Sequence, residues 1–381
     1  MNTDYSGYFD YASATPMSKE VIEAMHPYLS ARFHNPSAIY REASQVREDI
    51  DEARKQIAGV LGVKQQEIIF TSGCTEANNL AINGVMSKYP DAKVLVSSIE
   101  HDSVLEPASE YTVAQIPVTS DGIVDCRAFS QMLSDEVVLV SVMYANNEVG
   151  TIQPLRELGA IIEHERKRRG LKGLPLYFHT DAAQVVNYLS LNISGLRVDM
   201  MSLNSSKVYG PKGNGCLYVS SSVQINPLVR GGGQERGLRS GTENVMGIVG
   251  FAQALVAAQA THTIETIRLR ELQIRLIEKI VSTGGLLNGS LKNRLPNNIN
   301  VCFAGVDNER LVLELDSKGF MVSSGSACHA KSGISSKVLE ALGLDQKGAK
   351  SSIRISMGKY TTKYDVDNLS SCLLQLVAKS R

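Results

Sequence analysis

Residues 203–213 read LNSSKVYGPKG and lead from a short apolar run that ends at Leu203 into a second apolar run, 215–219. The two runs are candidate strands, and the glycines and proline between them are typical of a turn. Lys207 lies in this turn. A lysine that loses its water there has a lowered pKa and becomes a nucleophile that can hold an aldehyde as a Schiff base. A solvated lysine in a Gly/Pro turn is the alternative, and the rest of the chain decides between the two.

The first 220 residues alternate between short apolar runs and helical patterns. The apolar runs are 68–70, 94–96, 137–142, 176–178 and 200–203, and helical periodicity covers 41–61, 75–88 and 154–169. This alternation predicts an α/β fold with a mostly parallel sheet that is flanked by helices on both faces.

The pattern changes after Gly241 and predicts a smaller α+β unit. We expect a large α/β domain over 15–260, and a small domain formed by 1–14 and 261–381. The elements expected in this part are helices over 244–260 and 264–281 with a stop at Gly284 and Gly285, a strand over 301–303, a helix over 309–316, a strand over 320–322, a helix over 336–342, a strand over 352–357, and a last helix begun by Thr361 and Thr362.

Composition restricts the class of partner. The 381 residues carry 39 basic and 39 acidic groups, and this balance argues against broad electrostatic capture of nucleic acid or of an anionic membrane. The N-terminus has no basic region followed by an apolar core, and no run approaches the roughly 20 apolar residues of a membrane span. The six cysteines show no pair at metal-ligand spacing. We therefore expect a cytoplasmic protein with free thiols and no metal site.

Three segments place polar side chains just after predicted strands, where open α/β sheets build their sites. Residues 70–79 read FTSGCTEANN, a strand, a small-residue turn and a helix start. The free N–H groups at such a start suit a phosphate, and Thr75 adds a hydroxyl. His101 and Asn147 follow the next two buried runs. Each has an ordinary alternative: any βα turn, a solvated loop histidine, or a turn-forming asparagine.

Asp181 ends an apolar strand in the segment 177–184, which reads YFHTDAAQ. A buried carboxylate needs a positive partner. The protonated pyridine nitrogen of pyridoxal 5'-phosphate (PLP) is such a partner, and its protonation makes the ring an electron sink. A helix cap is the alternative role for Asp181.

These motifs together resemble the cysteine desulfurases of the NifS/IscS type, among the class V, fold-type I PLP enzymes. They run from DYASATP at 10–16 to SSIRIS at 351–356, so the resemblance covers nearly the whole chain. It implies a homodimer that converts L-cysteine to L-alanine and passes sulfur, as an enzyme persulfide, to an acceptor protein. Iron–sulfur scaffold assembly, tRNA thiolation and DNA phosphorothioation all begin from such a persulfide, so the acceptor stays open.

The resemblance also implies roles for individual residues. Lys207 holds the cofactor and moves the substrate's α proton, Asp181 faces the pyridine nitrogen, and His101 stacks on the ring. Gln184 faces the ring hydroxyl, and Arg354 offers the substrate carboxylate a planar fork. The further implied cofactor contacts are Cys74, Thr75, Asn147, Asn204, Ser206 and, from the other subunit, Thr242; the implied substrate contacts are Asn35, Asn147 and Arg354.

One departure from the family concerns the phosphate. The family usually has Ser-Gly-His before its lysine, and both the serine and the histidine contact the phosphate. This chain has Asn204-Ser205-Ser206. Asn204 and Ser206 still offer an amide and a hydroxyl, but their reach and charge differ. The sequence therefore leaves open a lowered cofactor affinity.

Residues 322–333 read VSSGSACHAKSG, a loop of small residues around one cysteine. Small residues permit the backbone freedom that a travelling cysteine needs. The resemblance makes Cys328 the catalytic sulfur acceptor, with His329 and Lys331 lowering the pKa of its thiol. An inert loop cysteine is the alternative, and it is our interpretation of the other five, with the reservation that Cys74 adjoins the expected phosphate site.

Two other function classes remain open at this point. Another class V enzyme, such as a selenocysteine lyase or an aminotransferase, shares Lys207 and Asp181 but does not need an acceptor thiol. An idle homologue kept as a binding scaffold is motivated only by residues 204–206.

Overall fold

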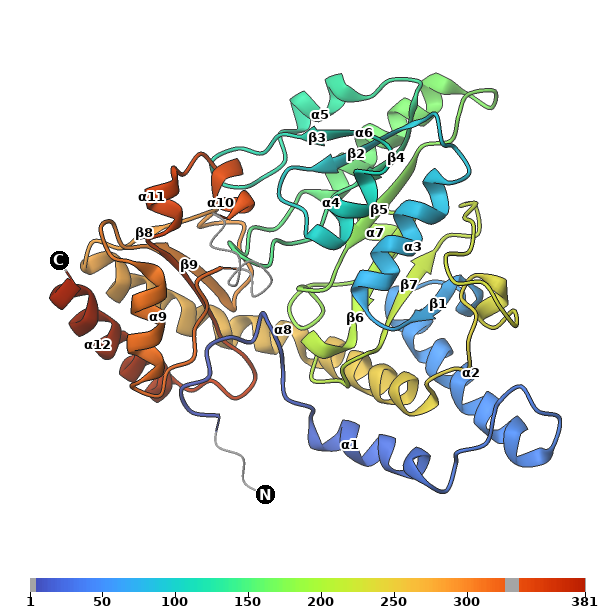
Figure 1. Cartoon of the computed structure of the whole chain (residues 1–381), viewed down its shortest axis with the longest axis horizontal. Helices are drawn as coiled ribbons and strands as arrows, with labels where there is room; N and C mark the ends of the chain where they lie inside the picture. Colours follow the sequence, from blue (N-terminus) through green and yellow to red (C-terminus); the bar gives the residue numbers. More distant parts are fainter. Residues whose placement is uncertain (1–4, 326–335, 381) are drawn as a thin grey trace.

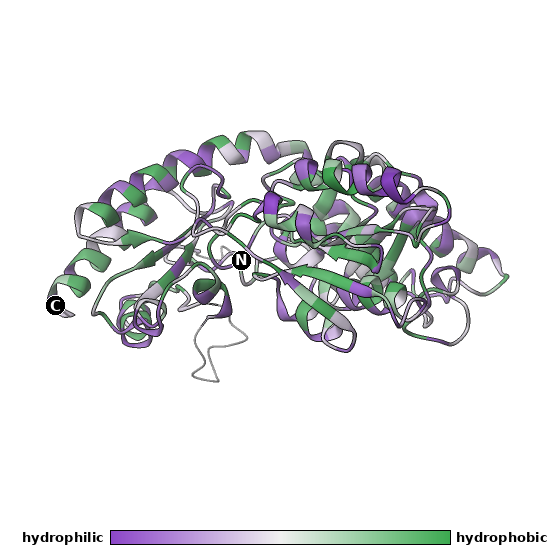
Figure 2. Ribbon diagram, turned by 90° about the horizontal axis from the view of Figure 1, so that it is seen from above, coloured by the Kyte–Doolittle hydropathy of each residue, from purple (hydrophilic) through white to green (hydrophobic). Residues whose placement is uncertain are grey.

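The computed structural model describes residues 5–325 and 336–380. Two β-sheets lie side by side, and one long helix, α8 (Val245–Ser282), runs past both of them (Figure 1). Figure 2 shows mostly hydrophobic residues along the strands, whereas the surrounding helices mix hydrophobic and hydrophilic residues. The core therefore lies between each sheet and its helices.

The large sheet has seven strands in the order β1-β7-β6-β5-β4-β2-β3. Neighbours from β6 to β3 are parallel, whereas β7 is antiparallel to both β6 and β1. The strands are β1 (Ile68–Thr71), β2 (Lys93–Ser97), β3 (Thr112–Ile116), β4 (Val137–Ser141), β5 (Tyr177–Asp181), β6 (Met200–Asn204) and β7 (Gly215–Val219). Helices cover the sheet, which explains why its strands are continuous apolar runs. The predicted mostly parallel sheet is confirmed.

The helices around this sheet include the three predicted from periodicity, which are α2, α3 and α6. Gly62 ends α2 in the left-handed conformation with a φ of +70°, as a C-cap glycine often does. Four short helices and the half-exposed edge strand β3 were not predicted, because they are too short or too polar to show a periodic signal. The helices are α1 (Lys19–Met25), α2 (Arg41–Leu61), α3 (Cys74–Met86), α4 (Asp102–Ala108), α5 (Cys126–Met132), α6 (Leu155–Arg169) and α7 (Ile193–Leu196).

The second sheet has three antiparallel strands in the order β10-β9-β8. The prediction of a strand over 320–322 is wrong. Met321 bridges only Tyr8 and Ser323 bridges only Arg354, because this segment passes between two partners instead of running along one. The elements are β8 (Leu286–Leu287), β9 (Asn298–Cys302), α9 (Asn308–Asp316), α10 (Lys337–Ala341), α11 (Gln346–Ala349), β10 (Ser352–Ser356) and α12 (Lys363–Ser380).

Helix α8 corrects the prediction of two helices over 244–260 and 264–281, because it continues through both as one helix of 38 residues. The three residues between the two predicted helices, Thr261, His262 and Thr263, are weak helix formers. Packing overrides that local preference: α8 contacts α1 and α2 at one end and α12, β8 and β9 at the other. It ends before Gly284, as predicted. The domain boundary that we expect at 260/261 falls inside α8, and the division into two domains stays a proposal.

Helix α8 is also long and apolar enough, by length and composition, to cross a membrane, and it is the one such helix among the described residues. Its contacts with α1, α2, α12, β8 and β9 place it within the fold of this chain. The five cysteines among the described residues are free thiols, as predicted.

Candidate active site

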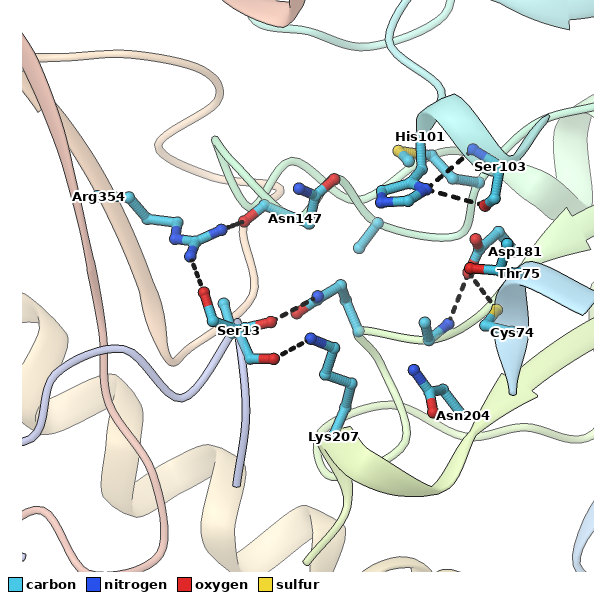
Figure 3. A pocket seen from close by; sticks show the side chains of 15 residues that line it. Ser13, Cys74, Thr75, His101, Ser103, Asn147, Asp181, Asn204, Lys207 and Arg354 are labelled. Atoms are coloured by element: carbon cyan, nitrogen blue, oxygen red, sulfur yellow. Dashed lines mark hydrogen bonds between the residues drawn. The ribbon is translucent and has the colours of Figure 1, made fainter. Parts of the chain in front are cut away.

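A cavity of about 320 Å³ opens at the carboxyl edge of the large sheet (Figure 3). It lies where the ends of several parallel strands converge, the usual place for a site in an open α/β sheet. Residues from the N-terminal segment and from β10 complete its wall. Nine residues that the sequence singled out line this cavity: Cys74, Thr75, His101, Asn147, Asp181, Gln184, Asn204, Lys207 and Arg354.

Four other predicted site residues are not in this group. Ser206 lies next to the wall and donates its hydroxyl to Oδ1 of Asn204 over 3.3 Å. Asn35 and Thr242 are exposed and do not line the cavity of their own chain. Cys328 lies outside the described residues.

Lys207 ends a short 3-10 helix, Ser205–Lys207, that follows directly from β6. Its ammonium donates a hydrogen bond to the carbonyl of Ser13, and its own carbonyl accepts one from Asn187 Nδ2 over 2.8 Å. Asn204 caps this turn, because its Oδ1 accepts from the backbone N–H of Ser206. The hydrogen bond from the ammonium and the hydrogen bond to the backbone carbonyl therefore hold both the side chain and the backbone of Lys207 in place at the cavity.

Asp181 is buried at the end of β5 and is held by three donors. Its Oδ1 accepts from the backbone N–H of Ala183 over 2.9 Å and from the Cys74 thiol over 3.3 Å. Its Oδ2 accepts from Asn78 Nδ2 over 2.7 Å. Burial, with the nearby charge of Asp181, raises the pKa of the Cys74 thiol well above its usual value, so this thiol acts as a donor. Such a carboxylate is fixed in place and ready to face one more positive group.

The first turn of α3 borders the cavity through Cys74 and Thr75. Its N-cap is Gly73, which has a φ of +150° and no side chain to accept from the first N–H groups. Uncapped N–H groups at the positive end of a helix dipole suit an anion. The hydroxyl of Thr75 lies at the same end.

His101 is the N-cap of α4, and its Nδ1 accepts from the backbone N–H of Ser103 over 3.1 Å. The hydroxyl of Ser103 lies 2.8 Å from the same nitrogen. The preceding Glu100 is buried, and burial raises the pKa of its carboxyl from 4.5 to about 8, so it is neutral below that pH. Because Glu100 is neutral below that pH, the residue directly before His101 carries no negative charge there.

Arg354 reaches the cavity from β10 and is almost completely buried. Its Nη1 donates to the carbonyl of Asn147 over 3.0 Å, and its Nη2 donates to Asp10 and to Ser13 over 2.7 and 2.6 Å. Its Nε is buried without a partner among the described residues. Arg354 lines the cavity, and a guanidinium at such a wall can give an anionic ligand a charge-assisted hydrogen bond.

Comparison with known proteins identifies the family of this site. A family model described as aminotransferase class V matches residues 7–369. The cysteine desulfurase IscS of Dictyoglomus turgidum is 43% identical over 384 residues, which cover 98% of this chain and 95% of that protein. The chain belongs to the cysteine desulfurases of the class V aminotransferase family.

Solved structures agree with this placement of the desulfurase. A NifS-like protein matches with a TM-score of 0.91 at 32% identity, over 98% of this chain and 99% of that one. A structure of SspA in complex with cysteine matches with a TM-score of 0.80 at 35% identity, over 93% of this chain and 100% of that one. The family, fold class and enzyme class predicted from the sequence are confirmed.

The class V family depends on PLP, and the donor set of this desulfurase fits that cofactor. Asp181 offers a fixed carboxylate for a pyridine nitrogen, Lys207 offers an amine for an aldehyde, and the uncapped start of α3 offers N–H groups for a phosphate. The cavity volume lies at the lower end of the range for small-molecule sites. The residues present therefore agree with PLP in both chemistry and space.

Sequence reasoning missed two buried side chains of this site, Asn78 and Ser103. Asn78 is one helical turn after Cys74 on α3, a spacing that puts both on one face. Ser103 is two residues after His101 in the first turn of α4. Both spacings are visible in the sequence, but neither spacing indicates that the side chains of Asn78 and Ser103 are in contact.

Proposed function

We propose that this desulfurase binds PLP and L-cysteine in the cavity described above and converts the substrate to L-alanine while its sulfur passes to Cys328 as a persulfide. The observation that carries this proposal is the arrangement of Lys207 and Asp181. An amine and a hydrogen-bonded carboxylate come from the ends of neighbouring strands β6 and β5 and line one cavity beside an uncapped helix start.

PLP supplies an electron sink for the bond changes at the substrate's α and β carbons. The residues of the chain would bind and orient both the cofactor and the substrate. Asp181 would keep a proton on the pyridine nitrogen, Lys207 would take and return the substrate's α proton, and the guanidinium of Arg354 would bind the substrate carboxylate. Asn147 and Asn204 would add amide contacts from opposite walls.

Sulfur transfer completes the reaction. The Cys328 thiolate attacks the substrate's sulfur, an S–S bond forms, the C–S bond of the substrate breaks, and its β carbon gains a proton to become the methyl group of alanine. The persulfide's outer sulfur then passes to a thiol of an acceptor protein. Free thiols throughout the described chain favour the reducing cytoplasm as the place of this transfer.

The proposal is tested by incubating the PLP-loaded protein with L-cysteine and measuring alanine, pyruvate and protein-bound persulfide. We expect alanine and sulfide in equal amounts when a thiol reductant is present, because the thiol reduces the persulfide and is itself oxidised to a disulfide, and we expect no pyruvate. Pyruvate or a keto acid as the main product would indicate an aminotransferase or a lyase instead. A turnover rate with L-selenocysteine that greatly exceeds the rate with L-cysteine would indicate a selenocysteine lyase.

A homodimer with shared sites is the second part of the proposal. Thr242 and Asn35 are exposed and lie outside their own chain's cavity. The segment between α1 and α2 carries apolar side chains at the surface: Leu29, Phe33 and Ile39 are 65%, 71% and 98% exposed. Exposed apolar side chains that cluster in one segment favour an interface, and two-fold symmetry is the commonest solution.

Mixing two variants with complementary defects tests this arrangement. If Thr242 serves the partner's cavity, a heterodimer of Lys207→Ala and Thr242→Ala contains one complete site, and we expect it to regain up to half of the parent activity per dimer at limiting PLP. Each variant alone stays low: Lys207→Ala at any PLP concentration, Thr242→Ala until PLP is in excess. The matched control is a double variant that carries both changes in one chain, mixed with parent protein. A fully active, PLP-loaded monomer in light scattering contradicts the proposal.

A further inference from the structure

Two buried side chains, Asn78 of α3 and Ser103 of α4, join the carboxylate of Asp181 to the imidazole of His101. Asn78 Nδ2 lies 2.7 Å from Asp181 Oδ2 and 2.8 Å from Ser103 Oγ. Ser103 Oγ lies 2.8 Å from His101 Nδ1. We call this pair, Asn78 and Ser103, the Asn78–Ser103 bridge. It connects two walls of the cavity, with Asn78 fully buried and Ser103 at the cavity surface.

The chemistry of the partners fixes the direction of every hydrogen bond in the bridge. Asp181 is an acceptor, so Asn78 must present its NH₂ group to it, and the second proton of that group points to Ser103 Oγ. The Asn78 carbonyl oxygen then points toward Cys74 Sγ, 3.9 Å away, while the proton of that thiol is directed to the closer Asp181 Oδ1. Because Ser103 Oγ accepts from Asn78, its single proton is available for His101 Nδ1.

His101 receives a second donor at the same nitrogen. The backbone N–H of Ser103 points to Nδ1 over 3.1 Å, and a backbone N–H can only donate. A proton on Nδ1 would face this N–H and would also remove the N-cap of α4. Nδ1 is therefore the unprotonated nitrogen, and the ring proton is on Nε2. Figure 3 shows Nδ1 joined to Ser103 and the other ring nitrogen directed away from it.

We infer that Asn78 and Ser103 are positioning residues that hold His101 as the neutral Nε2–H tautomer, so that it acts on the substrate as a hydrogen-bond donor and not as a proton acceptor. The lone pair that would take a proton is already occupied by the two Ser103 donors. Proton transfer at the substrate's α carbon is thereby left to Lys207. The inference rests on the proposed function only in treating this cavity as the reaction site.

The test reads the tautomer directly. PLP-loaded protein labelled with ¹⁵N-histidine is examined by two-bond ¹⁵N–¹H correlation NMR, and the chain's seven histidines are resolved by assigning His101 through its loss in His101→Gln. We expect His101 of the parent to carry its proton on Nε2 alone at pH 7.5. In Ser103→Ala, only the backbone donor remains, and we expect a detectable population protonated at Nδ1.

Turnover gives the second readout. Ser103→Ala is expected to lower kcat about 10-fold. KM and PLP affinity should change less than 2-fold, because the substitution removes no proposed contact with the substrate or with PLP. Ser103→Thr keeps the hydroxyl and should restore both the tautomer and most of kcat. Ser109→Ala is the matched control: Ser109 is the C-cap of the same helix, its hydroxyl bonds a backbone carbonyl, and its loss should change neither readout.

The outcomes separate the inference from the proposed function. A parent His101 that carries its proton on Nδ1, or on both nitrogens, overturns the inference whatever the activity. An unchanged tautomer in Ser103→Ala, with kcat and thermal stability falling together, also overturns it and leaves Ser103 a structural role. If the protein does not act on L-cysteine but His101 carries its proton on Nε2 and responds to Ser103→Ala, the proposed function fails and the assignment of the bridge stands.

Discussion

Replacing Lys207 by alanine is expected to lower alanine formation from L-cysteine by at least about 10³-fold. Among the described residues that line the cavity, Lys207 carries the only amine. Arg354 cannot replace it, because a guanidinium keeps its proton in proteins and does not act as a nucleophile. The variant therefore loses both the covalent hold on the cofactor and the group that moves the α proton.

Borohydride reduction followed by mass spectrometry checks the first of these losses. The parent should gain the mass of reduced cofactor on the peptide that contains Lys207, and Lys207→Ala should gain none. Lys212→Ala is the matched control, since Lys212 lies in the same turn but is exposed and outside the cavity. It should bind PLP and turn over like the parent. A Lys207→Ala variant with a near-normal rate would refute the assignment.

The residues at the carboxyl ends of the strands were predictable because topology alone brings them together. Asp181 ends β5 and Asn204 ends β6, so the parallel pairing of these strands puts both at one edge of the sheet. Lys207 follows within one short turn. For such positions, a strand run and the residue after it are enough to predict the site.

The Asn78–Ser103 bridge was not predictable in this way. Asn78 and Ser103 lie on two different helices, and their contact depends on how α3 packs against α4. No local pattern encodes that packing. The same reason explains the error over α8, which was predicted as two helices over 244–260 and 264–281, whereas contacts with elements at both ends keep it continuous.

The small sheet shows a third kind of limit. The run 301–303 was predicted as a strand from its apolar residues, but β9 begins earlier, at Asn298, and pairs Asn298 and Asn300 with residues of β10. Asparagine is uncommon in strands. In β9 the asparagine side chains make hydrogen bonds to the backbone of another segment. Asn298 Nδ2 donates to the carbonyl of Asn147, and Asn300 Nδ2 donates to the carbonyl of Glu148. Side-chain hydrogen bonds to the loop after β4 thus outweigh the local preference.

Cys328→Ser is expected to lower alanine formation from L-cysteine by several orders of magnitude while leaving cofactor and substrate binding intact. Neither binding step uses the thiol, so the absorbance change on adding L-cysteine to the PLP-loaded protein should persist. A serine hydroxyl has a far higher pKa than a thiol and little affinity for sulfur, so it cannot accept the substrate's sulfur. The expected loss is therefore in kcat, with KM changed little.

Two comparisons make this result specific to sulfur transfer. Cys126→Ser removes a thiol that is half-buried at the start of α5 and does not line the cavity, and it should turn over like the parent. Substrates that eliminate a good leaving group, such as β-chloroalanine, should still react in Cys328→Ser, because Lys207 and Asp181 are unchanged. If Cys328→Ser forms alanine from L-cysteine at close to the parent rate, Cys328 is not the acceptor, and the sulfur must leave the substrate without an enzyme persulfide at that position.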